Sequence, residues 1–198
     1  DNYHKLVTDP LWEPRLKGAI INNVKFFAIH MLVQNPLGLL LASLLSSPYI
    51  RGRTIYRTLI FTPTVLSVVL IGFIWSMILS PLWGISGDFF NAIGLEQYAK
   101  KPWLGLESTA LTTLSLVSVW QWVGIPMMLF LASLISIPDE LIEAARVDGA
   151  TGWGVFWRIK FPLILPTVGI VSVLTFVGNF NAFDLIYATQ KINAGPNF

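Results

Sequence analysis

The stretch from residue 108 to residue 138 reads STALTTLSLVSVWQWVGIPMMLFLASLISIP and contains no Asp, Glu, Lys or Arg. Three other stretches, residues 26–50, 58–87 and 161–183, are also free of charge. The chain of 198 residues is 54% hydrophobic and 12% charged, whereas a soluble domain carries about 25% charged residues. A buried core could account for one such run, but four of them indicate repeated crossings of a hydrocarbon layer ~30 Å thick. The sequence therefore predicts a polytopic membrane protein and excludes disordered, coiled-coil and ordinary soluble classes.

Four transmembrane helices are expected, and the predicted fold class is an all-α helical bundle. Continuous apolar runs are typical of helices, because a barrel strand would alternate over about ten residues. At 1.5 Å per residue each helix would be about 31 Å or longer, which is sufficient to cross a bilayer. The expected spans are residues 20–45, 59–79, 111–135 and 163–183.

The connections between these spans indicate an orientation. Connections 46–58 and 136–162 together hold six Lys and Arg residues, and connection 80–107 holds two. The positive-inside rule then predicts that the first two connections lie in the cytoplasm. The aromatic residues of connection 80–107 fit either a belt at the outer membrane interface or a loop that packs on its own helices. They are Trp83, Phe89, Phe90 and Trp103.

Residues 136–162, SIPDELIEAARVDGATGWGVFWRIKFP, form the most informative connection. Ser136 is expected to cap the start of a helix, and Gly149 is expected to end that helix in a left-handed conformation. Thr151 is expected to cap a second short helix, which Pro162 would end. The pattern predicts a helix–glycine–helix elbow, and an amphipathic loop lying on the membrane surface is the open alternative. The apolar face expected on the first helix consists of Leu141, Ala144 and Ala145.

A known signature matches this elbow. Glu143-Ala144-Ala145, then three residues and Gly149, then nine residues and Ile159-Lys160-Phe161-Pro162 resemble the signature loop of bacterial ABC importer permeases. Phe161 stands where the family has Leu. The other matches resemble the carbohydrate-importer branch, which includes the maltose and glycerol-phosphate permeases. They are Arg51-Gly52, Tyr56-Arg57, Phe61-x-Pro63, Gly72 to Trp75, Ile78 to Pro81, Ile137-Pro138 and Phe183-Asp184.

The resemblance implies a type I ABC importer permease fold in the bacterial cytoplasmic (inner) membrane. The family has a first and a last helix that this sequence is expected to lack. In the family the elbow is the coupling helix, which docks on a cytoplasmic ATPase subunit. Glu143 would hold the docking through polar contacts, small alanines would permit close approach, and Gly149 would set the turn. The residues expected to couple to the ATPase are Glu143, Ala144, Ala145, Arg146, Asp148 and Gly149; Arg146 and Asp148 could equally be a solvated pair.

The resemblance also implies the partners of the chain. A second homologous permease subunit, two ATPase subunits and an extracytoplasmic solute-binding protein are expected, with membrane lipid around the chain and a sugar-like solute passing through it. The basic residues form no run, so nucleic acid is not an expected partner.

The chain is not expected to be an enzyme. It has no G-x-x-x-x-G-K-[ST] loop and no Gly-Lys dipeptide, so ATP and Mg are expected on the ATPase subunit, with no cofactor in this chain. The sequence also has no H-E-x-x-H motif, no G-x-S-x-G motif and no Cys, and no catalytic residue or metal site is expected. His30 is expected to be a hydrogen-bonded packing residue rather than a proton relay.

Polar residues within two of the spans mark an expected solute path, because a polar side chain at the membrane midplane faces protein or water. Gly124 and Pro126 are expected to bend the 111–135 helix. Trp120 offers an aromatic face and Asn179 an amide, the two kinds of group that bind sugars. By alignment with the maltose permease, whose sugar site lies on these two helices, the expected lining residues are Trp120, Val123, Gly124, Met127, Thr175 and Asn179. Helix packing is the open alternative for all six.

The expected function is that of the membrane-spanning subunit of an ATP-driven sugar-class importer. An importer permease for a non-sugar solute is the first alternative. A secondary transporter or channel is the second, but proton or ion coupling usually needs carboxylates within the membrane, and the four charge-free runs contain none. A membrane-bound enzyme is the weakest alternative, since no catalytic cluster is visible.

Overall fold

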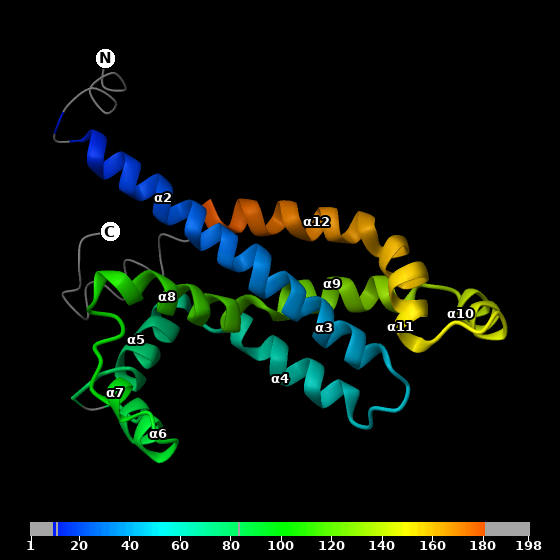
Figure 1. Cartoon of the computed structure of the whole chain (residues 1–198), viewed down its shortest axis with the longest axis horizontal. Coiled ribbons are helices and arrows are strands. Elements are labelled where there is room, and N and C mark those ends of the chain that lie inside the picture. The colour runs from blue at the N-terminus through cyan, green and yellow to red at the C-terminus, as the bar shows by residue number, and fades with distance from the viewer. Residues whose placement is uncertain (1–9, 11, 83, 181–198) are drawn as a thin grey trace. The chain divides into compact units, whose positions relative to one another are not determined.

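The computed structural model describes residues 10, 12–82 and 84–180, and over these residues the chain is helical without any strand (Figure 1). This confirms the predicted all-α class. In chain order the elements, with η for a π-helical turn, are α2 (Glu13–Ile29), η1 (His30–Gln34), α3 (Asn35–Ser46), α4 (Arg53–Val65), α5 (Val68–Ile78), α6 (Ser86–Ala92), α7 (Glu96–Ala99), α8 (Glu107–Trp122), α9 (Gly124–Ile135), α10 (Asp139–Val147), α11 (Gly152–Val155), η2 (Phe156–Lys160) and α12 (Phe161–Phe180).

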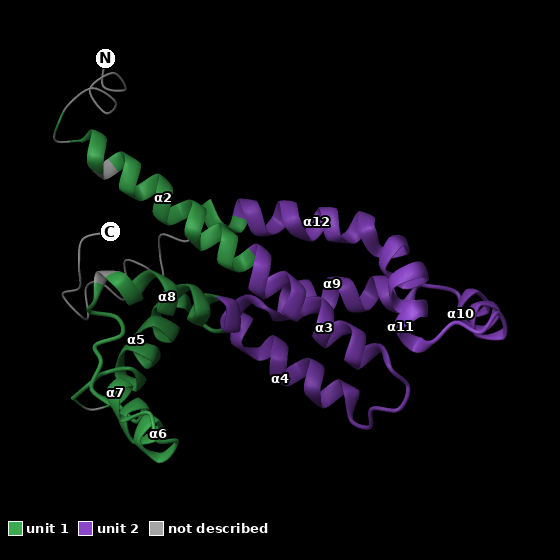
Figure 2. Ribbon diagram, in the orientation of Figure 1, with its two compact units in different colours: residues 1–30, 66–118, 178–198 green, residues 31–65, 119–177 purple. Residues whose placement is uncertain are grey.

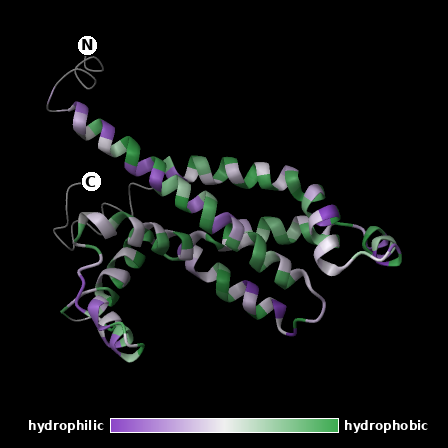
Figure 3. Ribbon diagram, in the orientation of Figure 1, coloured by the Kyte–Doolittle hydropathy of each residue, from purple (hydrophilic) through white to green (hydrophobic). Residues whose placement is uncertain are grey.

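Only some of the helices in the described part of the chain are candidates for crossing a membrane. Two helical stretches, Leu16–Ser46 and Gly152–Phe180, are long and apolar enough to cross a membrane. Two further pairs, α4 with α5 and α8 with α9, pass the same test only together, and each pair is bent by more than 40° at a short break. The described residues thus contain two candidate spans, or four if each bent pair is one span. Apolar colour dominates α5, α9 and α12 in Figure 3.

The expected helix over residues 59–79 is two helices in the structure. Helix α4 already begins at Arg53, and the break follows Val65. Ser67 adopts an extended conformation, with φ −58° and ψ 133°, before α5 starts at Val68. Pro63 lies one turn before the break and lacks the N–H that would continue the helical ladder. An uninterrupted apolar run does not reveal such a break, because hydropathy carries no information on backbone dihedral angles.

The expected bend in the 111–135 helix is confirmed. Helix α8 ends at Trp122 and α9 begins at Gly124, with Pro126 in the first turn of α9, where a missing N–H breaks no bond. Val123 joins the two helices, because its N–H donates to the Val119 carbonyl at 2.9 Å and its own carbonyl accepts from Met127 N–H at 3.1 Å. The last expected span ends at residue 183, and its final residues, with the Phe183-Asp184 match, lie outside the described residues.

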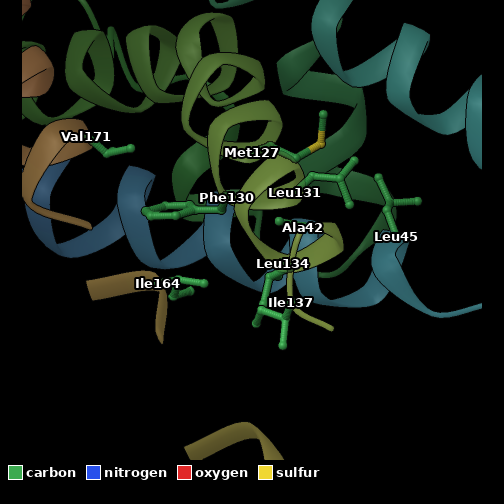
Figure 4. Packing of buried hydrophobic residues seen from close by; sticks show 9 residues of the cluster. All are labelled: Ala42, Leu45, Met127, Phe130, Leu131, Leu134, Ile137, Ile164 and Val171. Atoms are coloured by element: carbon green, nitrogen blue, oxygen red, sulfur yellow. The ribbon is translucent and has the colours of Figure 1, made fainter. Parts of the chain in front are cut away.

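The chain divides into two compact units, shown in Figure 2. Unit 2 comprises Met31–Val65 and Val119–Val177 and holds the main hydrophobic core. Close approach of α3 and α9 is permitted by Gly38, since a Cβ there would lie 3.1 Å from the Met127 nitrogen. The core side chains come from α3, α9, α12 and a position two residues before α10 (Figure 4): Ala42, Leu45, Met127, Phe130, Leu131, Leu134, Ile137, Ile164 and Val171.

Unit 1 comprises residues Asp1–His30, Leu66–Ser118 and Gly178–Phe198. His30 ties α2 to α8 in this unit. Its Nδ1 lies 2.8 Å from the Phe26 carbonyl oxygen, and its Nε2 lies 3.0 Å from the Ser118 hydroxyl. The His30 side chain is buried and its ring packs on the Phe26 ring. The expectation of a hydrogen-bonded packing histidine is therefore confirmed.

Candidate functional site

The elbow begins two residues later than the sequence predicts. Helix α10 starts at Asp139 with Pro138 as its N-cap residue, and Asp139 and Glu140 occupy its first turn, where the helix dipole favours acids. Ser136 instead ends α9, and its hydroxyl donates to the Ser133 carbonyl at 2.8 Å. The expected cap at Ser136 is wrong because Ile137 precedes a proline, and the residue before proline is disfavoured in helical conformation.

Gly149 ends α10 as the sequence predicts. Its φ is +83°, a left-handed conformation that glycine adopts without steric penalty. Gly149 N–H donates to the Arg146 carbonyl at 3.0 Å, and Ala150 N–H reaches back to the Ala145 carbonyl at 2.9 Å. These two hydrogen bonds define a Schellman motif, which satisfies the carbonyls that the helix end would leave unpaired.

Thr151 begins the second arm of the elbow. Its Oγ1 accepts a hydrogen bond from Gly154 N–H at 3.2 Å, which confirms the expected cap. The expectation that Pro162 ends this helix is wrong, because the helical stretch runs from Gly152 to Phe180. Phe161 N–H donates to the Phe156 carbonyl, five residues earlier, in the π-turn η2. Such a wider turn relieves the clash that a proline ring makes with the preceding helical turn.

Most of the expected coupling residues of the elbow are exposed. Ala145 is the exception, because it is buried and packs inward. Two large apolar side chains that the sequence did not single out are also strongly exposed: Val147 at 87% and Trp153 at 73%. The charged neighbours Arg146 and Asp148 are the signal that could have identified Val147, whereas Trp153 lies between two glycines and has no such signal. The exposed expected residues are Glu143, Ala144, Arg146, Asp148 and Gly149.

The expected path residues of α8 and α9 divide into one exposed and three buried positions. Trp120 is 43% exposed, while Val123 and Gly124 are buried and Met127 is completely buried in the core cluster (Figure 4). A Cβ at Gly124 would lie 2.9 Å from the Cα of Phe61 in α4. The burial of Gly124 and Met127 within the chain therefore favours helix packing for these two residues over lining a path.

The expected path residues of α12 are both buried. Thr175 lies near the end of unit 2, and its hydroxyl donates to Asn35 Oδ1 at 3.1 Å and to the Val171 carbonyl at 2.8 Å. Asn179 lies one turn further along the helix, with a side chain that is 6% exposed. Asn35 was not among the expected residues, although a polar amide within an apolar run is itself a signal of a protein-facing position.

Residues 34–194 match the family described as "Binding-protein-dependent transport system inner membrane component", and the chain belongs to this family. This confirms the resemblance drawn from the elbow. The "Probable ABC transporter permease protein YurN" of Bacillus subtilis is 36% identical over 187 residues, which cover 94% of this chain and 62% of YurN. The arabinooligosaccharides transport system permease protein AraP of Bacillus subtilis is 29% identical over 185 residues, 93% of this chain and 58% of AraP.

A solved structure has the same fold. It is the crystal structure of a bacterial ABC transporter involved in the import of the acidic polysaccharide alginate, and a chain of it superposes with a TM-score of 0.80 at 25% identity. The match covers 94% of this chain and 66% of that chain. The present chain thus spans about three fifths of the length of its two bacterial relatives.

Proposed function

We propose that this chain forms the membrane-spanning permease part of an ATP-driven sugar-class importer. Membership of the binding-protein-dependent transport family supports the transport role. Relatives named as permeases for arabinooligosaccharides, lactose and multiple sugars support the solute class. The single observation that carries the coupling role is the elbow at Gly149, which projects an exposed short helix from the end of a candidate membrane span.

The elbow is suited to transmit force. Helix α10 is held at a fixed turn by the Schellman motif at Gly149. The second arm continues without a break from Gly152 to Phe180, a stretch of 29 residues that is long enough to cross a membrane. A movement imposed on α10 would therefore be passed to the membrane helix, because only the four residues 148–151 connect α10 to α11. Glu143 and Ala144 offer a polar group and a small surface for docking in a groove of the ATPase subunit.

The partners in this proposal follow from the transport family to which the chain belongs. Its sequence contains no phosphate-binding loop, so ATP and Mg would bind to two separate ATPase subunits. A second homologous permease subunit would complete the path, and an extracytoplasmic binding protein would deliver the solute. One similar solved structure is a bacterial alginate ABC transporter in complex with an alginate pentasaccharide-bound periplasmic protein, with a TM-score of 0.81 and 26% identity, which supports the binding protein as a partner.

Trp120 is the strongest candidate for contact with the solute, because its exposed aromatic face can stack on a sugar ring. Thr175 and Asn179 supply a hydroxyl and an amide one turn apart on α12. These residues form the proposed substrate path, together with Val123 at the bend between α8 and α9.

The coupling role is tested in the assembled transporter, purified from membranes through a tag on the full-length permease. Glu143→Ala should reduce the amount of co-purified ATPase subunit on the order of tenfold, the effect of losing one strong interface contact. Glu140→Ala is the matched control, because Glu140 is exposed on the same helix but lies outside the signature. Equal recovery of the ATPase subunit with both variants would contradict the coupling role.

The solute class is tested separately with the wild-type complex in liposomes. A sugar supplied with the binding protein should stimulate ATP hydrolysis. Stimulation by an amino acid or phosphate and by no sugar would contradict the sugar class while leaving the importer role intact.

A further inference from the structure

Residues 84–105 lie between α5 and α8 and include helices α6 and α7, which pack against each other; this segment is here called the α6–α7 hairpin. The hairpin has a small core of its own. The Phe90 and Trp103 rings stack at 5.5 Å, and the Tyr98 and Trp103 rings stack at 5.8 Å. Ala99 is buried beside them, and Gly87 permits close approach, since a Cβ there would lie 3.1 Å from the Ala99 carbonyl oxygen.

Exposed apolar side chains lie on α6 and on residues next to its ends, and they form an apolar stripe that consists of Leu82, Ile85, Phe89 and Ile93. Phe89 N–H donates to the Ile85 carbonyl at 3.1 Å, and Ile93 N–H donates to the Phe89 carbonyl at 3.2 Å. These bonds place the last three side chains on one helical face. The four residues are 83%, 68%, 60% and 51% exposed in chain order. The Phe89 ring meets the Phe90 ring edge-on at 5.8 Å, so one side of Phe89 rests on the aromatic core of the hairpin while the rest of the side chain is exposed.

Hydrogen bonds and close packing join the two ends of the hairpin to α5 and α8. At the first end, Gly84 N–H donates to the Ser80 carbonyl at 2.9 Å, and a Cβ at Gly84 would overlap the carbonyl oxygen of Ile78, the last residue of α5. At the other end, the Thr109 hydroxyl in the first turn of α8 donates to the Trp103 carbonyl at 3.0 Å. These contacts attach one end of the hairpin closely to the end of α5 and the other end to the start of α8.

We propose that the apolar stripe lies in the lipid bilayer, at the boundary between headgroups and acyl chains. Helices α5 and α8 each belong to a bent pair that passes the membrane-span test only as a pair, and the proposal places the hairpin that joins them at the membrane surface. Exposed aliphatic and aromatic side chains on one face of a short helix are suited to that boundary. Asp88 and Glu96 balance Lys100 and Lys101 in this segment, so the insertion relies on apolar burial and not on anionic lipid.

Site-directed spin labelling tests the position of the stripe. The 198 residues contain no cysteine, so Phe89→Cys adds the single cysteine of this stretch. Any cysteine elsewhere in the full-length permease or in its partners is replaced by serine before the complex is labelled in phosphatidylcholine nanodiscs. Asp88→Cys is the matched control, because Asp88 is exposed and adjacent but points to another side of α6. The ratio of oxygen to nickel-chelate accessibility should be higher at Phe89 than at Asp88 by about threefold or more. Retained ATPase activity shows that the labelled complexes are folded, and Ile93→Cys is a second labelling site.

Equal accessibility ratios at Phe89 and Asp88 in the absence of the binding protein would overturn the proposal. Protection of Phe89 that arises only when the binding protein is added would also overturn it, because the stripe would then be a protein-docking surface. Replacing a third of the phosphatidylcholine by phosphatidylglycerol should leave the ratio unchanged, and a strong dependence would contradict the apolar mechanism. None of these results depends on the sugar or on coupling at the elbow.

Discussion

Thr175 donates a hydrogen bond to Asn35 although 140 positions separate them in the sequence, with Oγ1 and Oδ1 3.1 Å apart. Both side chains are buried in unit 2. Asn35 also donates to the Met31 sulfur at 3.3 Å, so its amide is held from two sides. A buried polar pair of this kind joins α3 to α12, and burial raises the cost of leaving either group without a partner.

The strength of this pair can be measured by a double-mutant cycle. Asn35→Leu and Thr175→Val should show a coupling energy of about 0.6 kcal/mol, the average for side-chain hydrogen bonds between membrane helices. The measurement is the unfolding free energy in mixed micelles. Ser172→Ala is the control partner, because the Ser172 hydroxyl donates to the Val168 carbonyl of its own helix. Asn35→Leu and Ser172→Ala should be additive, and additivity of the first pair as well would contradict a contribution from the hydrogen bond.

Replacement of Gly149 should uncouple the elbow. In Gly149→Val a β-branched residue would have to adopt a φ of +83°, which costs about 1–2 kcal/mol. The Schellman motif should open, and the complex should lose ATPase association while the permease remains inserted in the membrane. Gly152→Val is the control, because it lies in the same elbow with open space around it and no positive φ. Normal ATPase association in Gly149→Val would argue against the coupling role.

A methyl group at Gly124 should destabilise unit 2. In Gly124→Ala the new Cβ would lie 2.9 Å from the Phe61 Cα and 3.0 Å from the Ile60 carbonyl oxygen, and backbone atoms cannot rotate away. Overpacking of this kind costs about 1–3 kcal/mol, which should lower the thermal midpoint of the purified protein. Gly169→Ala in α12 has no neighbour within 4 Å and should leave the midpoint unchanged. Equal midpoints for the two variants would show that α4 and α9 can separate freely.

Replacement of Asn179 tests the solute path. Asn179→Leu should weaken solute-stimulated ATP hydrolysis far more than basal hydrolysis, because a hydroxyl-rich solute would lose a hydrogen-bonding partner. The expected loss is about 1–3 kcal/mol, or roughly 5- to 150-fold in the half-saturation concentration of the solute. Thermal stability is measured on the same variant. An unchanged half-saturation concentration with a lowered midpoint would mean that Asn179 only packs α12, and the sugar site would have to lie on the partner permease.

Features that depend on a few neighbouring residues could be predicted from the sequence. The absence of charge over four long runs was sufficient for an all-helical membrane protein, because a bilayer excludes unpaired charge whatever the tertiary arrangement. The left-handed turn at Gly149 and the cap at Thr151 were also predictable, since their hydrogen bonds span no more than five residues. The bend at Gly124 follows from the same kind of local chemistry.

Other features were decided only by tertiary structure. Helix α10 starts later than predicted, after Ser136, and Ile137 is buried in a core to which α3, α9 and α12 contribute. The helix continues through Pro162 because a π-turn precedes it, and no pattern in the sequence predicts that turn. The partner of Thr175 and the neighbour of Gly124 lie on other helices. A sequence specifies which side chains are polar or small. Which of these side chains contact one another depends on how whole helices pack, because many contacts between residues far apart in the sequence determine that packing.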